Sequence, residues 1–250
     1  MSKFADSRKL CFDVETTGTN VHKDRIVTAA VFLKGSSRPE LEYNYLINPG
    51  IPIPKEASEI HGIYDVDVKE RGSDARTALD EIAGRLAEAA RNGYPIIAYN
   101  LAFDYSMLEY ELKRYGLPTV SERAGFEIRT LVDPYVLDKS VDKYRKGKRK
   151  LQNVSEHYGV TDGEYQWHEA MADAKAATGI AEVLFNRFPF LDRMGPRKLY
   201  ASQQRWRREQ YESLQAYFRN PTKCGPDKYN PSAVVIPDWP LIIRNGDGAA

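Results

Sequence analysis

The sequence of 250 residues has little cysteine, no large excess of charge of one sign and no long apolar run. Its two cysteines, Cys11 and Cys224, lie far apart, which excludes a disulfide-rich secreted scaffold and fits a reducing compartment. Lysine and arginine number 36 and aspartate and glutamate 35, so a formal net charge of +1 excludes a histone-like basic binder. No run approaches the roughly 18 apolar residues that cross a bilayer, and the N-terminus lacks an apolar signal core. We therefore expect a soluble, cytoplasmic protein with no membrane partner.

The sequence also lacks any repeat of about 20–50 residues, which excludes solenoids and propellers. Alternating and apolar patterns predict strands over 10–14, 26–33, 41–47, 95–99 and 127–132. Helical spacing predicts helices over 75–91, 101–115, 151–158, 169–188 and 197–218. The short turn at 35–39 predicts an antiparallel hairpin. We expect an α/β domain with a mixed sheet over 7–190, followed by a C-terminal helix and an extended tail over 191–250.

Two acids stand at the end of the first predicted strand, in the segment Asp13-Val14-Glu15. Residues two apart on a strand point to the same face, so these two carboxylates project together. Like charges side by side repel unless a cation or a proton neutralises them. Taken alone, the pair is also compatible with two solvated acids at a strand end.

Asp104, His168 and Asp173 are the other candidates for chemistry. Asp104 falls in the first turn of the helix after the 95–99 strand, where ligands bind in α/β sheets but where the helix dipole alone also favours an acid. His168 and Asp173 are five residues apart, which is about 140° between directions on a helix. They can therefore reach one site only if His168 lies at or before the start of the helix. Taken singly, each of these residues is compatible with an ordinary surface position.

The combination predicts a metal site. Four carboxylates, on Asp13, Glu15, Asp104 and Asp173, carry a charge that matches two Mg²⁺ or Mn²⁺ ions. Hard divalent cations prefer oxygen ligands, and two of them about 3.5–4 Å apart suit in-line displacement at phosphorus. A neutral histidine such as His168 can accept a proton from water near physiological pH.

These motifs resemble those of the DnaQ-like 3′→5′ exonucleases of the DEDD type, in the subgroup with a histidine base. The resemblance covers about residues 8–188 and is carried by FDVETTG at 12–18, NLAFD at 100–104 and the spacing from His168 to Asp173. The segments at 47–54, 61–63 and 146–151, with Asp133, are similar to proofreading epsilon subunits of bacterial DNA polymerase III. Tyr99 departs from the pattern, because those subunits commonly carry histidine there.

The resemblance implies a ribonuclease H-like fold, in which helices flank a mixed β-sheet, and a two-metal site. It assigns the metals to Asp13, Glu15, Asp104 and Asp173 and the role of general base to His168. Residues implied to contact the terminal nucleotide are Thr16, Thr17, His61, Asn100 and Phe103. The implied reaction is hydrolysis of phosphodiester bonds at the 3′ end of DNA, expected to be single-stranded, which releases nucleoside 5′-monophosphates during DNA replication or repair.

Three alternatives stay open. The first is the same chemistry on RNA 3′ ends, as in relatives similar to ribonuclease T or oligoribonuclease, because no residue in the sequence shows whether a 2′-hydroxyl is recognised. A non-catalytic nucleic-acid-binding module is a second alternative, although it would not need four converging acids. A third is an ordinary α/β protein whose acids are unrelated in space. The C-terminal helix has no clear match to the polymerase-binding tail of epsilon subunits, so we expect a nuclease without a polymerase partner.

Cations concentrate in two segments. Residues 139–150 carry seven cations and one acid, and we expect an exposed basic loop there. Residues 193–208 carry six cations and no acid, interleaved with Tyr200 and Trp206. These charges are equally compatible with a surface that tracks phosphates and with a solvated helix, whereas we expect the aromatic side chains to pack on the domain.

Overall fold

The computed structural model describes residues 4–161 and 168–243. Within these residues one mixed sheet has the strand order β4-β3-β2-β1-β5-β6. Its strands are β1 (Lys9–Thr16), β2 (Ile26–Lys34), β3 (Leu41–Asn48), β4 (Ser73–Asp74), β5 (Ile96–Ile97) and β6 (Leu131–Val132). β2 pairs antiparallel with β1 and β3, whereas β5 runs parallel to β1 and β6. The predicted mixed sheet and hairpin are confirmed, although the last two strands are shorter than predicted.

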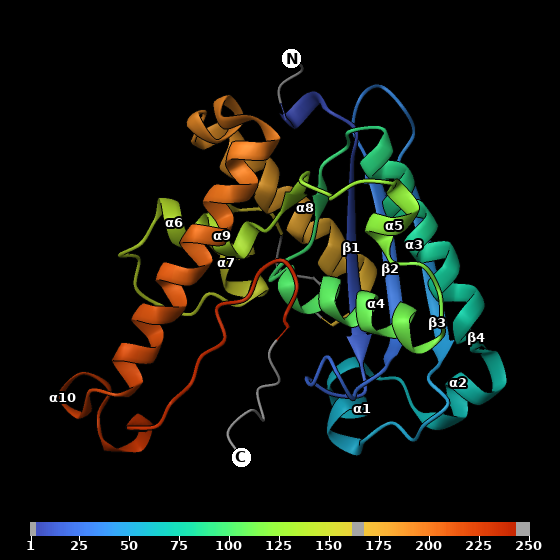
Figure 1. The fold of residues 1–250 in the computed structure, drawn as a ribbon, viewed down its shortest axis with the longest axis horizontal. Coiled ribbons are helices and arrows are strands. Elements are labelled where there is room, and N and C mark those ends of the chain that lie inside the picture. The colour runs from blue at the N-terminus through green and yellow to red at the C-terminus, as the bar shows by residue number, and fades with distance from the viewer. Residues whose placement is uncertain (1–3, 162–167, 244–250) are drawn as a thin grey trace.

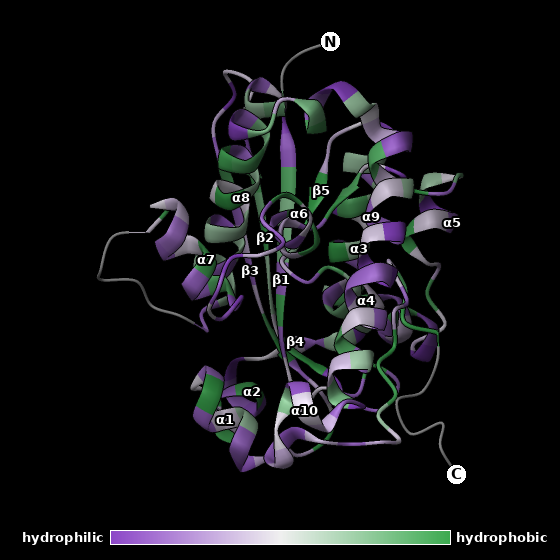
Figure 2. Cartoon of the chain, turned by 90° about the vertical axis from the view of Figure 1, so that its left-hand side faces the viewer, coloured by the Kyte–Doolittle hydropathy of each residue, from purple (hydrophilic) through white to green (hydrophobic). Residues whose placement is uncertain are grey.

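Helices cover both faces of this sheet, as Figure 2 shows. On one face lie α3 (Ala75–Arg91) and α4 (Ala102–Arg114), and on the other lie α7 (Leu151–Tyr158) and α8 (Ala170–Arg187). The alternation along β1 produces this division, because Phe12 and Val14 join the core under α3 and α4 while Cys11 joins the core under α8. Asp13 and Glu15 share the face of Cys11, so β1 directs both acids toward α8.

Four short helices that precede α7 were not predicted, because each is too short to show a clear helical period. They are α1 (Lys55–His61), α2 (Asp65–Arg71), α5 (Val120–Ala124) and α6 (Pro134–Val141). Local capping explains two of them. The Thr119 and Glu122 side chains form a capping box on α5, and the Asp133 carboxylate accepts hydrogen bonds from the first backbone N–H groups of α6. Across the described residues, no helix is long and apolar enough to span a membrane.

The C-terminal region lies against the rest of the molecule. α9 (Phe190–Phe218) contains a break at Gly195, whose φ is 69°, and continues from Pro196 as the predicted helix. α10 (Pro221–Cys224) follows Asn220, where the helix was predicted to stop. The tail after α10 then runs back along α9 to α4 (Figure 1). There the Ser106 hydroxyl accepts a hydrogen bond from the Ile242 backbone at 2.8 Å, and the Tyr110 hydroxyl donates one to the Ile242 carbonyl at 2.9 Å.

The prediction of an exposed basic loop over 139–150 is wrong for two of its arginines. Arg145 and Arg149 both donate to the carboxylate of Asp138, which is fully buried on α6, at 2.6 Å. The hydroxyl of Tyr158 donates to the same carboxylate at 2.8 Å. A buried carboxylate needs such partners, so these cations hold the loop to the domain instead of facing solvent. The lysines at 146, 148 and 150 are exposed.

Candidate active site

The first acidic pair stands where β1 ends. Asp13 and Glu15 are both partly buried, and the neighbouring residues Val14 and Thr16 are buried. The pairing of β1 with β2 shifts register between Glu15 and Thr16. Such an irregularity bends a strand and re-aims the adjacent side chain, and here it lies beside the acid that faces α8.

Asp104 comes to this strand end from α4. It lies in the first turn of that helix, as predicted, and is only 4% exposed. One carboxylate oxygen, Oδ1, accepts a hydrogen bond from the backbone N–H of Val14 at 3.2 Å. This hydrogen bond joins the NLAFD segment at 100–104 to the middle of the FDVETTG segment at 12–18.

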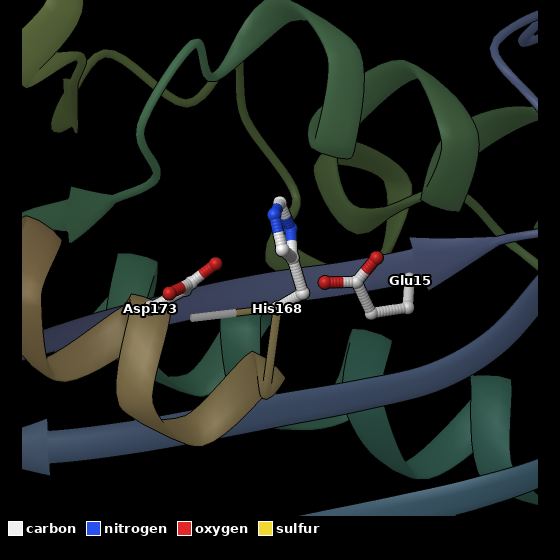
Figure 3. A group of neighbouring side chains, drawn as sticks. All are labelled: Glu15, His168 and Asp173. Atoms are coloured by element: carbon white, nitrogen blue, oxygen red, sulfur yellow. The ribbon is translucent and has the colours of Figure 1, made fainter. Parts of the chain in front are cut away.

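His168 and Asp173 approach from the other side of the strand end. α8 begins at Ala170, so His168 precedes the helix, which is the geometry that the spacing required. The backbone of His168 has a positive φ of 68°. Ligand atoms of Glu15, His168 and Asp173 all lie within 4.8 Å of one another. Figure 3 shows the imidazole ring between the two carboxylates.

Mutual repulsion and burial govern the protonation of these acids. Burial, then the charges of Asp104, Asp173 and Glu15, raise the pKa of Asp13 well above its usual range. Burial and the Asp173 charge raise the pKa of Glu15 to about 8. Burial raises the pKa of Asp104 too, and it raises that of Asp173 to about 6 against a hydrogen bond from the His168 backbone. Among the described residues, no lysine or arginine offsets these four acids.

The residues present fit a divalent metal ion. The Oδ1 atom of Asp173 is buried and has no hydrogen-bond partner, although such an atom normally has one. Asp173 belongs to the close group with Glu15 and His168. Carboxylate oxygens are ligands for divalent cations, and a cation would relieve the repulsion that raises the pKa of each acid.

Of the residues implied to contact a nucleotide, His61 lies near His168 and the end of β1. Its Nδ1 accepts a hydrogen bond from the Ile63 backbone at 3.1 Å. Its pKa is lowered, first by burial and also by the nearby His168, while a hydrogen bond with the Thr16 backbone opposes this. The loop that ends α1 therefore lies over the end of β1.

The two threonines are used locally. The hydroxyl of Thr16 donates to the Gly18 carbonyl at 2.6 Å, and that of Thr17 accepts from the Arg25 backbone at 3.0 Å. Both hydroxyls stabilise the turn after β1, so a ligand would contact the other atoms of these two threonines. Phe103 is partly buried and packs against the core under α3 and α4.

Asn100 is joined to residues that sequence reasoning missed. Its side-chain oxygen accepts a hydrogen bond from Nη1 of Arg207 on α9 at 3.0 Å. Its backbone N–H donates to the buried Asp133 carboxylate at 3.0 Å, and Nε1 of Trp239 donates to the other oxygen of that carboxylate at 3.2 Å. Nothing in the sequence distinguishes Arg207 from the other cations of its segment, and Trp239 stands in a tail without periodic pattern.

Comparison with known proteins agrees with this geometry. A family model described as exonuclease (RNase_T) matches residues 10–181. The PolC-type DNA polymerase III of Thermotoga maritima is 30% identical over 200 residues, which is 79% of this chain and 13% of that protein. The polymerase of the same type from Lactococcus lactis is 33% identical over 119 residues, 47% of this chain and 7% of that protein.

Solved structures of exonuclease I share the fold. That of Methylocaldum szegediense superposes with a TM-score of 0.60 at 20% identity, covering 83% of this chain and 45% of the other. That of Escherichia coli, in complex with a 5cy-dT13 oligonucleotide, gives 0.63 at 18% identity and covers 86% and 46%.

The sheet order, the flanking helices and these superpositions define a ribonuclease H-like exonuclease fold, as predicted. The chain belongs to the DnaQ-like exonuclease family, whose model matches most of its length. It spans 13% of the Thermotoga maritima polymerase, 7% of the Lactococcus lactis polymerase and less than half of exonuclease I.

Proposed function

We propose that this chain is a metal-dependent 3′→5′ exonuclease that releases nucleoside 5′-monophosphates from single-stranded DNA. The observation that carries the proposal is the convergence of Glu15, His168 and Asp173, of which Asp173 has a buried carboxylate oxygen without a hydrogen-bond partner. Family membership supports the reaction, and the dT13 and other oligonucleotide complexes of E. coli exonuclease I support the substrate.

In this proposal Asp13, Glu15, Asp104 and Asp173 hold the metal ions. Two Mg²⁺ or Mn²⁺ ions, when bound, would supply charge stabilisation for the attacking water and for the departing 3′ oxygen. His168 accepts the proton of that water as oxygen attacks phosphorus, and the bond from phosphorus to the 3′ oxygen breaks. The exposed position of His168 on the segment before α8 lets the proton pass on to solvent.

The remaining predicted residues orient the end of the strand. His61, the last residue of α1, lies near His168, and its lowered pKa keeps the ring neutral, so it adds no positive charge there. The turn that the Thr16 and Thr17 hydroxyls stabilise follows β1, and Phe103 offers an apolar side chain for contact with the terminal nucleotide.

The first experiment is a time course on a 5′-labelled single-stranded DNA oligomer with Mg²⁺, Mn²⁺ or a chelator. We expect a metal-dependent ladder that shortens from the 3′ end. No cleavage by folded protein with either metal, on DNA or on RNA of the same sequence, would contradict the proposal in favour of a binding module. Faster cleavage of the RNA oligomer would replace DNA by RNA as the substrate.

The second experiment replaces the proposed base. His168→Ala should slow the chemical step by about 10²–10⁴-fold, because water then loses its proton acceptor. The thermal shift caused by Mn²⁺ should remain, since the four carboxylates are unchanged. His157→Ala, on α7 beside Asp142, is the matched control and should keep its rate. A normal rate for His168→Ala at saturating metal would assign the proton to another group.

A further inference from the structure

Asn100 has a backbone conformation that needs support. Its φ is 61°, in the left-handed region, which asparagine adopts more readily than most residues but less freely than glycine. Its carbonyl accepts a hydrogen bond from the Phe103 backbone at 2.9 Å and so opens the turn that carries Asp104. The direction of the Asp104 carboxylate therefore depends on how Asn100 is held.

Two groups hold Asn100, and both belong to segments outside the motif. The Asp133 carboxylate accepts from its backbone N–H, and Nη1 of Arg207 donates to its side chain, each at 3.0 Å. The first contact fixes the backbone of Asn100 and the second fixes its side chain. A left-handed residue persists where its surroundings determine it in this way.

Arg207 is itself fixed in place. It is only 3% exposed, unlike its neighbours Arg205 and Arg208, and its guanidinium carbon lies 3.6 Å from the ring centroid of Tyr211, one turn further along α9. Burial raises the pKa of Asp133 to about 6, and the Arg207 charge is the first influence that lowers it. A buried, stacked guanidinium between an acid and an amide is a fixed structural contact, not a solvated cation.

The same α9 helix and the tail complete the support of Asp133. Gln203, one turn before Arg207, accepts from the Asp133 backbone N–H at 2.7 Å and donates to the Leu131 carbonyl at 2.9 Å. Trp239 donates to the Asp133 carboxylate from the tail. This network of buried polar groups therefore ties the C-terminal region to the start of α4.

We propose that Arg207 is a positioning residue, which holds Asn100 in its left-handed conformation and thereby aims Asp104 at the metal site. The role rests on the proposed function, since it concerns the same site. It makes the C-terminal helix α9, which lies beyond the residues matched by the exonuclease family, part of the active-site scaffold.

The test compares Arg207→Met with Arg205→Met, which removes the same charge from an exposed position on the same helix. Arg207→Met should lower kcat on the DNA oligomer by about 10–100-fold, as loss of an outer-shell partner does, with KM changed less than about twofold. Arg205→Met should keep both constants. A raised KM with normal kcat would overturn the proposal, because it would make Arg207 a substrate-binding group.

A double-mutant cycle tests the route through Asn100. Glycine adopts a positive φ without support, so Arg207→Met should have little further effect on kcat in an Asn100→Gly background. If the kcat losses of Arg207→Met and Asn100→Gly multiply in the double variant, Arg207 does not act through Asn100 and the proposal is overturned. If Arg207→Met does not fold, Arg207→Lys keeps the buried charge near Asp133 but loses the planar fork, and it enters the same cycle.

A readout without hydrolysis separates this inference from the proposed function. The midpoint of the Mn²⁺-induced thermal shift should move to about 10–100-fold higher concentration in Arg207→Met, since a misaimed Asp104 binds metal less well. Arg205→Met should keep the wild-type midpoint. An unchanged midpoint together with unchanged kcat would refute positioning. Wild-type protein that binds Mn²⁺ but does not cleave would refute only the function.

Discussion

Two charged clusters around acids withdrawn from solvent differ in their partners. At Asp138 the chain itself supplies the compensation, from Arg145, Arg149 and Tyr158. At Asp13, Glu15 and Asp173 the acids repel one another, and burial raises each pKa. The first cluster is neutralised by cations of the chain, whereas the second has no salt bridge to a lysine or arginine among the described residues. Burial of an acid therefore indicates function here only where the partner is missing.

The largest expected effect is on activity at the uncompensated cluster. Asp13→Ala should remove hydrolysis while leaving the metal-free protein as stable as wild type or more stable, because it relieves repulsion among acids. Rate assays on the DNA oligomer and thermal melts in chelator measure the two quantities. Asp80→Ala, at an exposed surface ion pair, is the control and should change neither. Retained hydrolysis would remove Asp13 from the site.

The compensated cluster should respond in the opposite way. Asp138→Ala should lower the free energy of unfolding by about 3–5 kcal/mol, because it leaves two buried arginines without their anion. Denaturant unfolding at neutral pH measures this change. Asp142→Ala removes an acid beside the same Arg145 from a more exposed position and should cost at most about 1 kcal/mol. Equal, small losses for both variants would abolish the contrast between the clusters.

A smaller effect should appear in the pH dependence of metal-free stability. A carboxyl whose pKa is raised on folding stabilises the fold when protonated, and this stabilisation disappears as pH rises through the folded-state value. Asp173 titrates at about 6 and Glu15 at about 8 instead of 3.8 and 4.5. In chelator, stability should therefore fall between about pH 4, where these carboxyls titrate in the unfolded chain, and about pH 8. Glu15→Gln should flatten the upper part of that fall, and a slope identical to wild type would contradict the raised pKa of Glu15.

The smallest expected effect concerns Tyr99, which stands where related epsilon subunits carry histidine. Its hydroxyl donates to the Arg149 carbonyl at 2.7 Å and so fastens the segment that compensates Asp138. Tyr99→Phe should lower the free energy of unfolding by about 0.5–1.5 kcal/mol, the usual net contribution of one hydrogen bond. The rate on the DNA oligomer should not change, and a lower kcat would give Tyr99 a role at the site.

The sequence predicted those parts of the fold that short-range patterns determine. Residues 75–91 and 151–158 coincide with α3 and α7, because each has a regular apolar face and a clear stop at Asn92 or Gly159. The sequence did not predict three short helices, α1, α2 and α5, since side-chain caps and packing determine them more than periodicity does.

The candidate site was predictable for a different reason. Asp13, Glu15, Asp104 and Asp173 follow strand ends or begin helices, so the topology of an α/β sheet alone brings them together. The partners of the remaining charges were not predictable. Arg145 and Arg207 look like their exposed neighbours in the sequence, and only the tertiary fold buries them beside Asp138 and Asn100.

The contact between the tail and α4 forms late during synthesis of the chain. Ser106 and Ile242 are 136 positions apart, so their contact closes one of the longest loops in the chain. On a ribosome, the first two motifs emerge long before the segment that clamps the helix carrying Asp104. The helix that carries Asp104 therefore gains this contact only when synthesis has passed residue 242, and a chain cut within the tail before that residue lacks it.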